Sequence, residues 1–422
     1  MTVIGLDDTD SRTLGMCTTY LATLVAEAIE QEGGTVERLL LIRLNPAVEH
    51  KTRGNAALAI HTDVPAGTAF DVARAELERW AVVDDDRTSP GLVVAPGSPD
   101  TVSTAVEEFA RDAVRDFHDT DRAVELATES GFLSQGWHGG RGRIGALAAV
   151  GAWTAFDEWT YEHISYREFH RCGTSREVDF DSVFDAAEAG YPNAWDTVDR
   201  VEGEAVCVPN APGPILHGIR GDDPETVRSV AADIVSESID RSATFLTNQG
   251  TDAHLRDGSL SDLRDGRAYR VTGSVTSKPE TRTGGHVFFD LSEDDATITV
   301  AAFEPTKRFR DHVRSLRVGD RLTVCGEVTD GTLKLEKFAV RDLVRTELAT
   351  PTCRDCGRTM KSAGRNQGYR CRDCGTDAPG KVETPLDRAL EVGWYEVPPC
   401  ARRHIAKPLV RGGFDASTHP ER

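Results

Sequence analysis

The chain opens with MTVIGLDDTD (residues 1–10), an apolar run that ends in three closely spaced aspartates. Residues 2–6 have the length and composition of a buried strand, and apolar residues recur at helical spacing over residues 16–29. The opening therefore predicts a strand, an acidic loop and a helix.

The following residues continue this alternation. Residues 37–44 and 56–61 are predicted strands, and residues 70–80 and 101–116 have the periodicity of amphipathic helices. This order favours an α/β or α+β domain. The glycine-rich residues 131–145 are interpreted as a domain boundary or a functional loop.

A second, small α+β sandwich is expected after residue 148. Its predicted elements are a strand at residues 161–167, a helix at 181–189, a strand at 215–219 and a helix at 224–239.

The pattern changes between residues 268 and 343 to short β-rich runs separated by turn residues. With a polar helical insert at residues 307–316, this spacing favours an OB-fold, and any other small β-barrel is the alternative. The five predicted strands are residues 269–275, 286–291, 297–303, 321–328 and 332–339.

Four of the nine cysteines form two Cys-x-x-Cys pairs near the end of the chain, Cys353 with Cys356 and Cys371 with Cys374. This spacing predicts a structural Zn²⁺ site with four thiolate ligands. Two disulfides are the alternative, which a reducing compartment disfavours. The other cysteines are interpreted as small buried apolar side chains: Cys17, Cys172, Cys207, Cys325 and Cys400.

The formal net charge is -20, which as an average argues against a polyanionic partner. Residues 351–411 differ, with twelve Lys or Arg against seven Asp or Glu. A basic module beside a β-barrel predicts contact with nucleic acid, although arginines that merely balance an acidic surface are the alternative. The candidate contacts are Lys361, Arg365, Tyr369, Arg402, Arg403 and His404.

No run approaches the roughly 18 apolar residues of a membrane span, and the acidic start is unlike a cationic signal peptide. A cytoplasmic protein is expected. Abundant Asp and Arg with little Lys are typical of a salt-adapted surface.

The acidic loop predicts a nucleotide site. Asp7, Asp8 and Asp10 follow a strand end, where their hard oxygens would bind Mg²⁺ and, with it, a triphosphate. The free amides at the start of the next helix would bind phosphate. An ordinary acidic turn with an N-capping Asp is the alternative. A second candidate phosphate contact lies at Lys51, Arg53, Gly54 and Asn55.

Several motifs together resemble the archaeal agmatine-conjugating tRNA-isoleucine cytidine ligases, also called tRNA agmatidine synthetases. The resemblance spans nearly the whole chain, and the order of the motifs is more specific than any one of them. The motifs are GLDDTDS (residues 5–11), GMCTTY (15–20), KTRGNAA (51–57), TNQGTD (247–252) and ARRH (401–404).

The resemblance implies a multidomain α/β and α+β protein with four parts. These are a kinase-like ATP and catalytic domain (residues 1–130, possibly discontinuous), a ferredoxin-like domain (131–260), an OB-fold (265–345), and a zinc ribbon with a basic C-terminal segment (350–412).

The resemblance also implies the reaction. The family uses ATP to join agmatine to carbon 2 of the wobble cytosine in tRNA-isoleucine with anticodon CAU; the cytosine carbonyl oxygen is phosphorylated, and ATP goes to AMP and phosphate. Asp7, Asp8 and Asp10 would hold metal or orient the attacking group, and Thr18 would become phosphorylated. The implied ATP contacts are Gly15, Met16, Cys17, Thr19, Lys51, Arg53, Gly54 and Asn55.

Agmatine is a dication, so an acidic catalytic half would attract it. For His138 a structural hydrogen bond or a position as an exposed loop residue are alternatives of at least equal weight, and Arg141 could equally contact phosphate or tRNA. The wobble base would leave its stack and enter a pocket between the first two domains. The candidate substrate residues are His138, Arg141, Asn248 and Asp252, with Gln135 and Trp137 as possible pocket lining.

Two other classes of protein remain open from the residues alone. One is a nucleic-acid-binding protein in which the N-terminal half is only a scaffold, which the acidic triad disfavours. The other is a metal-dependent phosphoesterase. Against it, the first sixty residues lack the additional histidine-rich ligand sets that such enzymes usually need. The sequence indicates no obligate protein partner.

Overall fold

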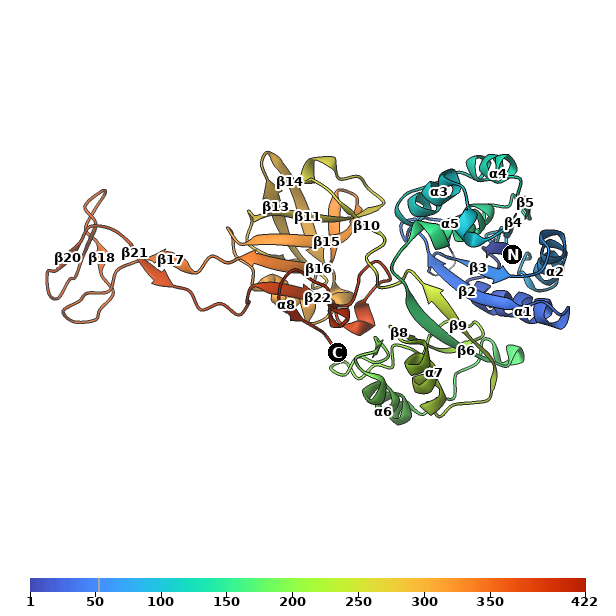
Figure 1. Ribbon diagram of the computed structural model, residues 1–422. Coiled ribbons are helices and arrows are strands. Elements are labelled where there is room, and N and C mark those ends of the chain that lie inside the picture. Colours follow the sequence, from blue (N-terminus) through green and yellow to red (C-terminus); the bar gives the residue numbers. More distant parts are fainter. Residues whose placement is uncertain (52–53) are drawn as a thin grey trace.

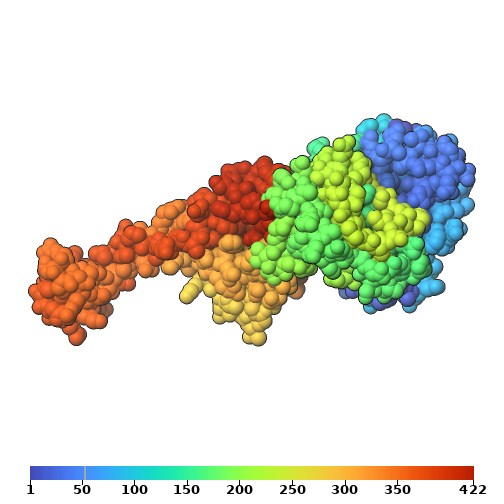
Figure 2. Space-filling model, turned by 90° about the horizontal axis from the view of Figure 1, so that it is seen from below, coloured from blue at the N-terminus to red at the C-terminus, as the bar shows by residue number. Residues whose placement is uncertain are grey.

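The structure is a computed structural model that describes residues 1–51 and 54–422. A broad N-terminal body, a β-barrel and a small terminal lobe follow one another along an elongated molecule (Figures 1 and 2). A narrow two-stranded stalk joins the small lobe to the barrel (Figure 1).

One mixed sheet of nine strands runs through the whole N-terminal body, in the order β5-β4-β1-β3-β2-β9-β6-β8-β7. All neighbours pair antiparallel except β2 and β9, which are parallel. The strands are β1 Thr2–Asp7, β2 Val36–Arg43, β3 Ala56–Thr62, β4 Gly91–Pro96, β5 Leu133–Gly136, β6 Thr160–Arg167, β7 Ala194–Trp195, β8 Ile215–Gly221 and β9 Ile239–Thr247.

Helices cover both faces of the first five strands. Side chains of a strand alternate between faces, so Val3 packs in one core while Ile4 and Leu6 pack in the other. One face carries α1 Thr18–Gln31 and α2 Ala66–Trp80, and the opposite face carries α3 Thr104–Arg115, α4 Thr120–Glu129 and α5 Arg143–Ala155.

The expected border after residue 130 does not match this packing. Strand β5 pairs with β4, and α5 lies directly on β1, where a Cβ on Gly5 would come within 2.0 Å of the Ala146 carbonyl oxygen. The first structural unit therefore extends to Ala155. Residues 131–145, interpreted as a border or functional loop, lie inside it.

The second unit consists of β6 to β9 with α6 Phe180–Gly190 and α7 Pro224–Asp233 packed on them. The predicted helix over residues 224–239 is too long, because the chain leaves α7 at Asp233 and enters β9 at Ile239. The missed strand β9 is the one that joins the two units.

The second nine-stranded sheet closes into a barrel around one apolar core. The five predicted runs all appear, and α8 Phe309–Arg314 occupies the predicted insert. The strands are β10 Leu255–Asp257, β11 Arg267–Val275, β12 Glu280–Thr281, β13 Val287–Glu293, β14 Ala296–Ala302, β15 Arg321–Thr329, β16 Thr332–Asp342, β22 Gly393–Glu396 and β23 Thr418–His419.

The C-terminal residues belong to the barrel and not, as expected, to the ribbon, because β22 pairs with β16. The ribbon itself is a three-stranded sheet of β18 Lys361–Ser362, β19 Tyr369–Arg370 and β20 Asp377–Ala378, carried on the stalk of β17 Thr346–Ala349 and β21 Val382–Pro385. Short 3-10 turns occur at Pro99–Thr101, Phe169–Arg171, Leu260–Asp262, Glu304–Thr306, Pro399–Ala401 and Leu409–Arg411.

Buried histidines predict acid sensitivity of the fold. Burial lowers the pKa of His61, His163, His217 and His254 to about 4. Because the unfolded chain takes up these protons near pH 6.5 and the folded protein does not, stability is lost as the pH falls from 6.5 toward 4. We expect each ring to cost about 1–2 kcal/mol between pH 7 and 5.

The measurement is the urea midpoint against pH at constant salt. The variant His61→Phe should flatten this slope, whereas the variant of the exposed His170, His170→Phe, should leave it unchanged. An unfolding midpoint that does not move between pH 7 and 5 would contradict the assignment.

Candidate active site

The topology brings one set of polar strand ends to a single edge of the sheet. Strands β1 and β2 both pair antiparallel with β3, so they run in the same direction, and β9 runs with them. The carboxyl ends of these three strands, the start of β3 and the start of β6 therefore meet. Asp7, Arg43, Asn248 and Glu162 lie at these ends.

The carboxylates of the acidic loop are shielded from solvent. Asp7 accepts a hydrogen bond from the Asp8 amide at 2.6 Å, and Asp8, at φ +57°, accepts from the Arg141 guanidinium at 2.7 Å and from the Ser89 amide at 3.2 Å. Burial and the neighbouring Asp8 raise the pKa of Asp7 well above its ordinary value. Burial also raises the pKa of Asp8, and Arg141 opposes that rise. This set of buried oxygens is suited to a bound cation.

The glycines before α5 allow this helix to approach Asp7. A Cβ on Gly145 would lie 2.0 Å from Asp7 Oδ2, and one on Gly142 would lie 2.6 Å from the Asp7 carbonyl oxygen. The close packing of the N-terminus of α5 on the acidic loop therefore requires glycine at these positions.

The start of α1 faces the same space. This helix begins at Thr18 with no acidic residue in its first turn and no side-chain cap from Cys17, so its first amides are available to an anion. Thr18 and Thr19 are each 6% exposed, and Thr9 Oγ1 donates to Thr18 Oγ1 at 3.1 Å.

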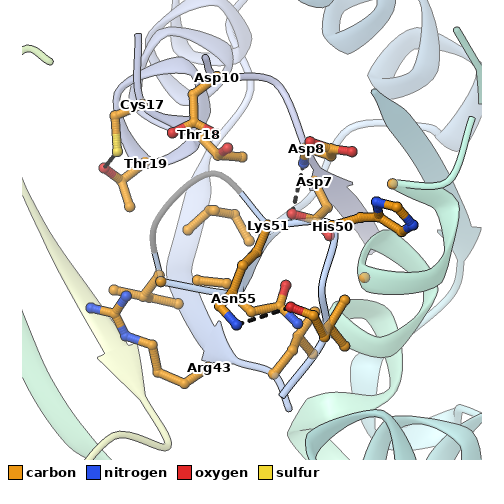
Figure 3. Close-up of a pocket in the computed structure, with 18 of the residues that line it drawn as sticks. Asp7, Asp8, Asp10, Cys17, Thr18, Thr19, Arg43, His50, Lys51 and Asn55 are labelled. Carbon is orange, nitrogen blue, oxygen red and sulfur yellow. Dashed lines mark hydrogen bonds between the residues drawn. The ribbon is translucent and has the colours of Figure 1, made fainter. Parts of the chain in front are cut away.

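A cavity of about 650 Å³ joins these elements and lies between the two units of the N-terminal body. Figure 3 shows the acidic loop, the first turn of α1 and the segment around Lys51 on different sides of it. Of the predicted catalytic and ATP residues, those that line the cavity are Asp7, Asp8, Asp10, Cys17, Thr18, Thr19, Lys51, Gly54 and Asn55. Predicted Arg53 lies outside the described residues.

Gly15 and Met16 do not line the cavity, but they shape the turn that enters α1. Gly15 has φ +95° and Met16 φ +61°, and the Met16 side chain is buried in the core beneath α1. We infer that they position Cys17 to Thr19 rather than contact ATP.

The segment around Lys51 is held by local bonds. The Lys51 ammonium donates to the carbonyl oxygens of Pro46 and Val48, and the Asn55 amide donates to the Asn45 carbonyl oxygen at 2.9 Å. Burial lowers the pKa of Lys51.

Asn248 supports the site without lining it. Its side-chain amide accepts from the Arg43 amide at 2.8 Å and donates to the Arg43 carbonyl at 3.0 Å, as a neighbouring strand would. The Arg43 guanidinium then donates to Gln249 at 2.8 Å and to Glu162 at 2.9 Å. Arg43 and Glu162 line the cavity and were not predicted. The signal available was the position of Arg43 at a strand end, parallel to Asp7.

Three other substrate candidates lie elsewhere. His138 is exposed, at φ +49°, and its carbonyl accepts a hydrogen bond from the Ser89 hydroxyl at 2.8 Å. Gln135 belongs to β5, and Trp137 packs against the core beneath α1 and α2. None of the three lines the cavity.

The prediction that Asp252 is a pocket residue requires correction, because its side chain connects the N-terminal body to the barrel. Its carboxylate lies 2.6 and 2.7 Å from the fully buried ammonium of Lys337 and 3.1 Å from Arg270. Removing one partner of such a pair leaves the other buried and unneutralised, so both are needed for docking.

The ARRH motif also requires correction as a tRNA contact. The Arg402 side chain is 4% exposed and pairs with Asp196 and, at 2.8 Å, with Glu396; the His404 ring is buried 5.0 Å from that of His254. Arg402 and His404 thus fix the C-terminal segment to the body. Arg403 pairs with Glu327 and Glu336 but remains 35% exposed.

Family models match four stretches of the chain. The TiaS TCKD domain matches residues 3–68, the TiaS FLD domain residues 140–254, an OB-fold nucleic acid binding domain residues 262–336, and the TiaS C-terminal zinc ribbon domain residues 350–390. The expected OB-fold and zinc ribbon are confirmed.

Similarity to a relative extends over the full length. The tRNA 2-agmatinylcytidine synthetase TiaS of Haloquadratum walsbyi is 59% identical over 100% of both chains. The chain belongs to the TiaS family. A crystal structure of TiaS with its isoleucine tRNA and ATP is 40% identical, with a TM-score of 0.89 over 100% of this chain and 99% of that one. A complex of TiaS with the same tRNA, AMPCPP and agmatine is 37% identical, with a TM-score of 0.87 over the same shares.

The TiaS ribbon carries the predicted metal site. The four cysteine sulfurs all lie within 4.8 Å of one another, and the sulfurs of Cys356 and Cys371 are 3.6 Å apart. A Zn²⁺ with ligands at about 2.3 Å sets sulfurs about 3.8 Å apart, so the cluster fits it. Backbone amides lower the pKa of Cys353 to about 6, whereas neighbouring sulfurs raise the pKa of Cys374 to about 12. Full ionisation of the four thiols therefore calls for a cation.

The ribbon has almost no apolar core of its own, since its buried cluster contains only Cys353, Met360 and Cys371. Lys361 and Arg365 are exposed on it, and Tyr369 is half-buried. Of its arginines, Arg358 and Arg370 pair with nearby aspartates. No helix in the described part of the TiaS chain is long and apolar enough to cross a membrane.

Loss of the metal should unfold the ribbon alone. We expect Cys371→Ser to lose Zn²⁺ and weaken tRNA binding at least about tenfold, because metal binding supplies the folding energy of such a small module. Bound zinc and tRNA affinity are the measurements, and Cys400→Ser, distant from the cluster in sequence, is the control. Retention of both metal and affinity by Cys371→Ser would contradict the assignment.

Proposed function

We propose that this protein joins agmatine to carbon 2 of the wobble cytidine of the isoleucine tRNA with anticodon CAU, giving agmatidine so that AUA codons are read. In the reaction ATP and water give AMP and two phosphates: one phosphoryl group activates the cytosine oxygen and departs with it as phosphate, and the other is released to water. The observation that carries the proposal is the cavity where the buried acidic loop faces Thr18 at the open start of α1. The chain has this site within a TiaS architecture of full length.

The reaction needs a leaving group on the base. A cytosine carbonyl oxygen leaves poorly, whereas the same oxygen carrying a phosphoryl group departs as phosphate when an amine attacks carbon 2. We assign the transfer of this phosphoryl group to Thr18, in a kinase-like step. Thr18 is suited to it because its hydroxyl receives a hydrogen bond from Thr9 and lies at the positive end of α1.

The other pocket residues bind and orient. The first amides of α1, with Cys17 and Thr19, are suited to hold phosphate oxygens, and Lys51 and Asn55 line the same cavity (Figure 3), as does Gly54. Asp7, Asp8 and Asp10 would hold Mg²⁺, which supplies charge neutralisation on the phosphates when bound. The fit rests on the buried carboxylates of Asp7 and Asp8, whose pKa values are raised.

The barrel and ribbon hold the tRNA outside the pocket. We propose contacts from Lys361, Arg365, Tyr369 and the exposed part of Arg403 to the RNA, and we place the reaction in the cytoplasm, where tRNA and ATP are found. The predicted extrusion of the wobble base fits a cavity that lies between the two units of the body.

The test is transfer of labelled agmatine into tRNA. Thr18→Ala should lower transfer at least about a hundredfold while tRNA affinity changes little, because the hydroxyl acts only in the chemical step. Thr18→Ser keeps a hydroxyl and should retain measurable transfer. Asp8→Asn should also lose transfer.

Other outcomes would select another function. Phosphate release from ATP without agmatine in the tRNA would favour a phosphoesterase. Retention of tRNA with neither ATP use nor transfer would favour a binding protein. Full transfer by Thr18→Ala would sink the assignment of Thr18.

A further inference from the structure

An aromatic side chain stands at the rim of the cavity, on the side of the barrel. Phe117 follows α3, lines the cavity and is 49% exposed. Among the aromatic residues of residues 1–51 and 54–422, only Phe117 and Phe180 are this exposed, and Phe180 does not line the cavity. An exposed Phe beside a substrate pocket indicates contact with a bound partner more strongly than an exposed Phe on an open surface does.

Side chains next to Phe117 connect its turn both to the N-terminal body and to the barrel. Arg115 donates to the Ala253 carbonyl at 2.7 Å, and Asp116 accepts from the Arg267 guanidinium at 2.8 and 3.0 Å. The Phe117 amide donates to the Asp116 carboxylate at 2.8 Å. The turn that carries Phe117 is therefore held in place before any ligand arrives, which limits the entropy lost on binding.

One edge of the Phe117 ring packs against the barrel. A Cβ on Gly266, which has φ +75°, would lie 2.5 Å from two carbons of the Phe117 ring. Gly266 is itself held by a hydrogen bond of 3.0 Å from the Asn45 side chain to its carbonyl oxygen. The barrel thus supports one edge of the ring, and 49% of the residue remains exposed.

Charged side chains of both signs lie near Lys51, which lines the same cavity. Burial lowers the pKa of Lys51, Glu327 opposes this, and the nearby cations Arg403, Arg12 and Lys334 add to it. Arg403 and Lys334 each pair with Glu327, whereas Arg12 donates to the Lys51 carbonyl at 3.0 Å. In a chain of net charge -20, Arg12 and the 35% exposed Arg403 near a cavity that has a half-exposed aromatic ring fit a nucleic-acid strand, with phosphates on the cations and a base on the ring.

We propose that Phe117 stacks on the adenosine that follows the wobble cytidine in the CAU anticodon. This rests on the proposed function. When the cytidine enters the cavity, the neighbouring base loses a stacking partner, and the ring at the rim replaces it. A purine offers the largest face for such a contact. Phe117 thereby positions the anticodon for the reaction without touching the reacting atoms.

The test compares Phe117→Leu with Phe117→Trp and with Phe180→Leu as the matched control. Leucine keeps apolar contact with Gly266 but cannot stack, so Phe117→Leu should raise the KM for tRNA about tenfold, with kcat changed less than about twofold. The KM values for ATP and agmatine should stay the same. Phe117→Trp should keep the wild-type KM, and so should Phe180→Leu.

A direct readout uses tRNA with 2-aminopurine in place of that adenosine. Stacking quenches this fluorophore, so the wild-type complex should be dim and the Phe117→Leu complex brighter. Equal KM values for wild type and Phe117→Leu, or equal fluorescence of the two complexes, would overturn the proposal. So would a rise in the KM for ATP with a lower unfolding midpoint, which would indicate mere packing. Failure of the proposed function differs, because wild type would then transfer no agmatine.

Discussion

The parallel contact between β2 and β9 is the constraint on which the rest of the structure depends. Only Leu40 with Leu246 and Leu41 with Thr247 are paired in it. The Asn248 side chain extends this short ladder by bonding both backbone groups of Arg43. Because this contact sets the direction of β9, the polar ends of both units meet at one edge. Any other register would move Arg43 away from Glu162.

The electrostatics follow from the same arrangement. The chain as a whole is acidic, whereas residues 351–411 carry more Lys and Arg than Asp and Glu, and the cavity itself is lined by both carboxylates and cations, including Asp7, Glu162, Arg43 and Lys51. Many other arginines form ion pairs that hold parts of the chain together, as Arg402 does with Asp196 and Glu396. The net charge of -20 therefore described neither the RNA-binding surfaces nor these ion pairs.

Local patterns predicted local features well. The acidic loop, Thr18 in the first turn of α1, the barrel strands and the four-cysteine cluster were all predicted from spacing alone or with the family resemblance, because each depends on residues close in sequence. The role of Asp252 depended on Lys337, and that of Asn248 on Arg43, partners far away along the chain. Such pairings follow from strand order, which periodicity does not contain. The glycines before α5 were interpreted as a border or a functional loop; the FLD model begins among them at residue 140, and Gly142 and Gly145 line the cavity, but their packing on Asp7 depends on strand order.

The ribbon has a consequence for how the chain evolved. Strands β16 and β22 are neighbours in the barrel, although the whole ribbon lies between them in sequence. At the base of the stalk, the Leu386 amide donates to the Arg345 carbonyl at 2.8 Å, so the chain leaves and returns at one point. Residues 346–385 are thus an insertion in a β-hairpin. A gene could gain, lose or exchange this segment while the barrel closes as before, because both ends of the segment meet at one point of the hairpin.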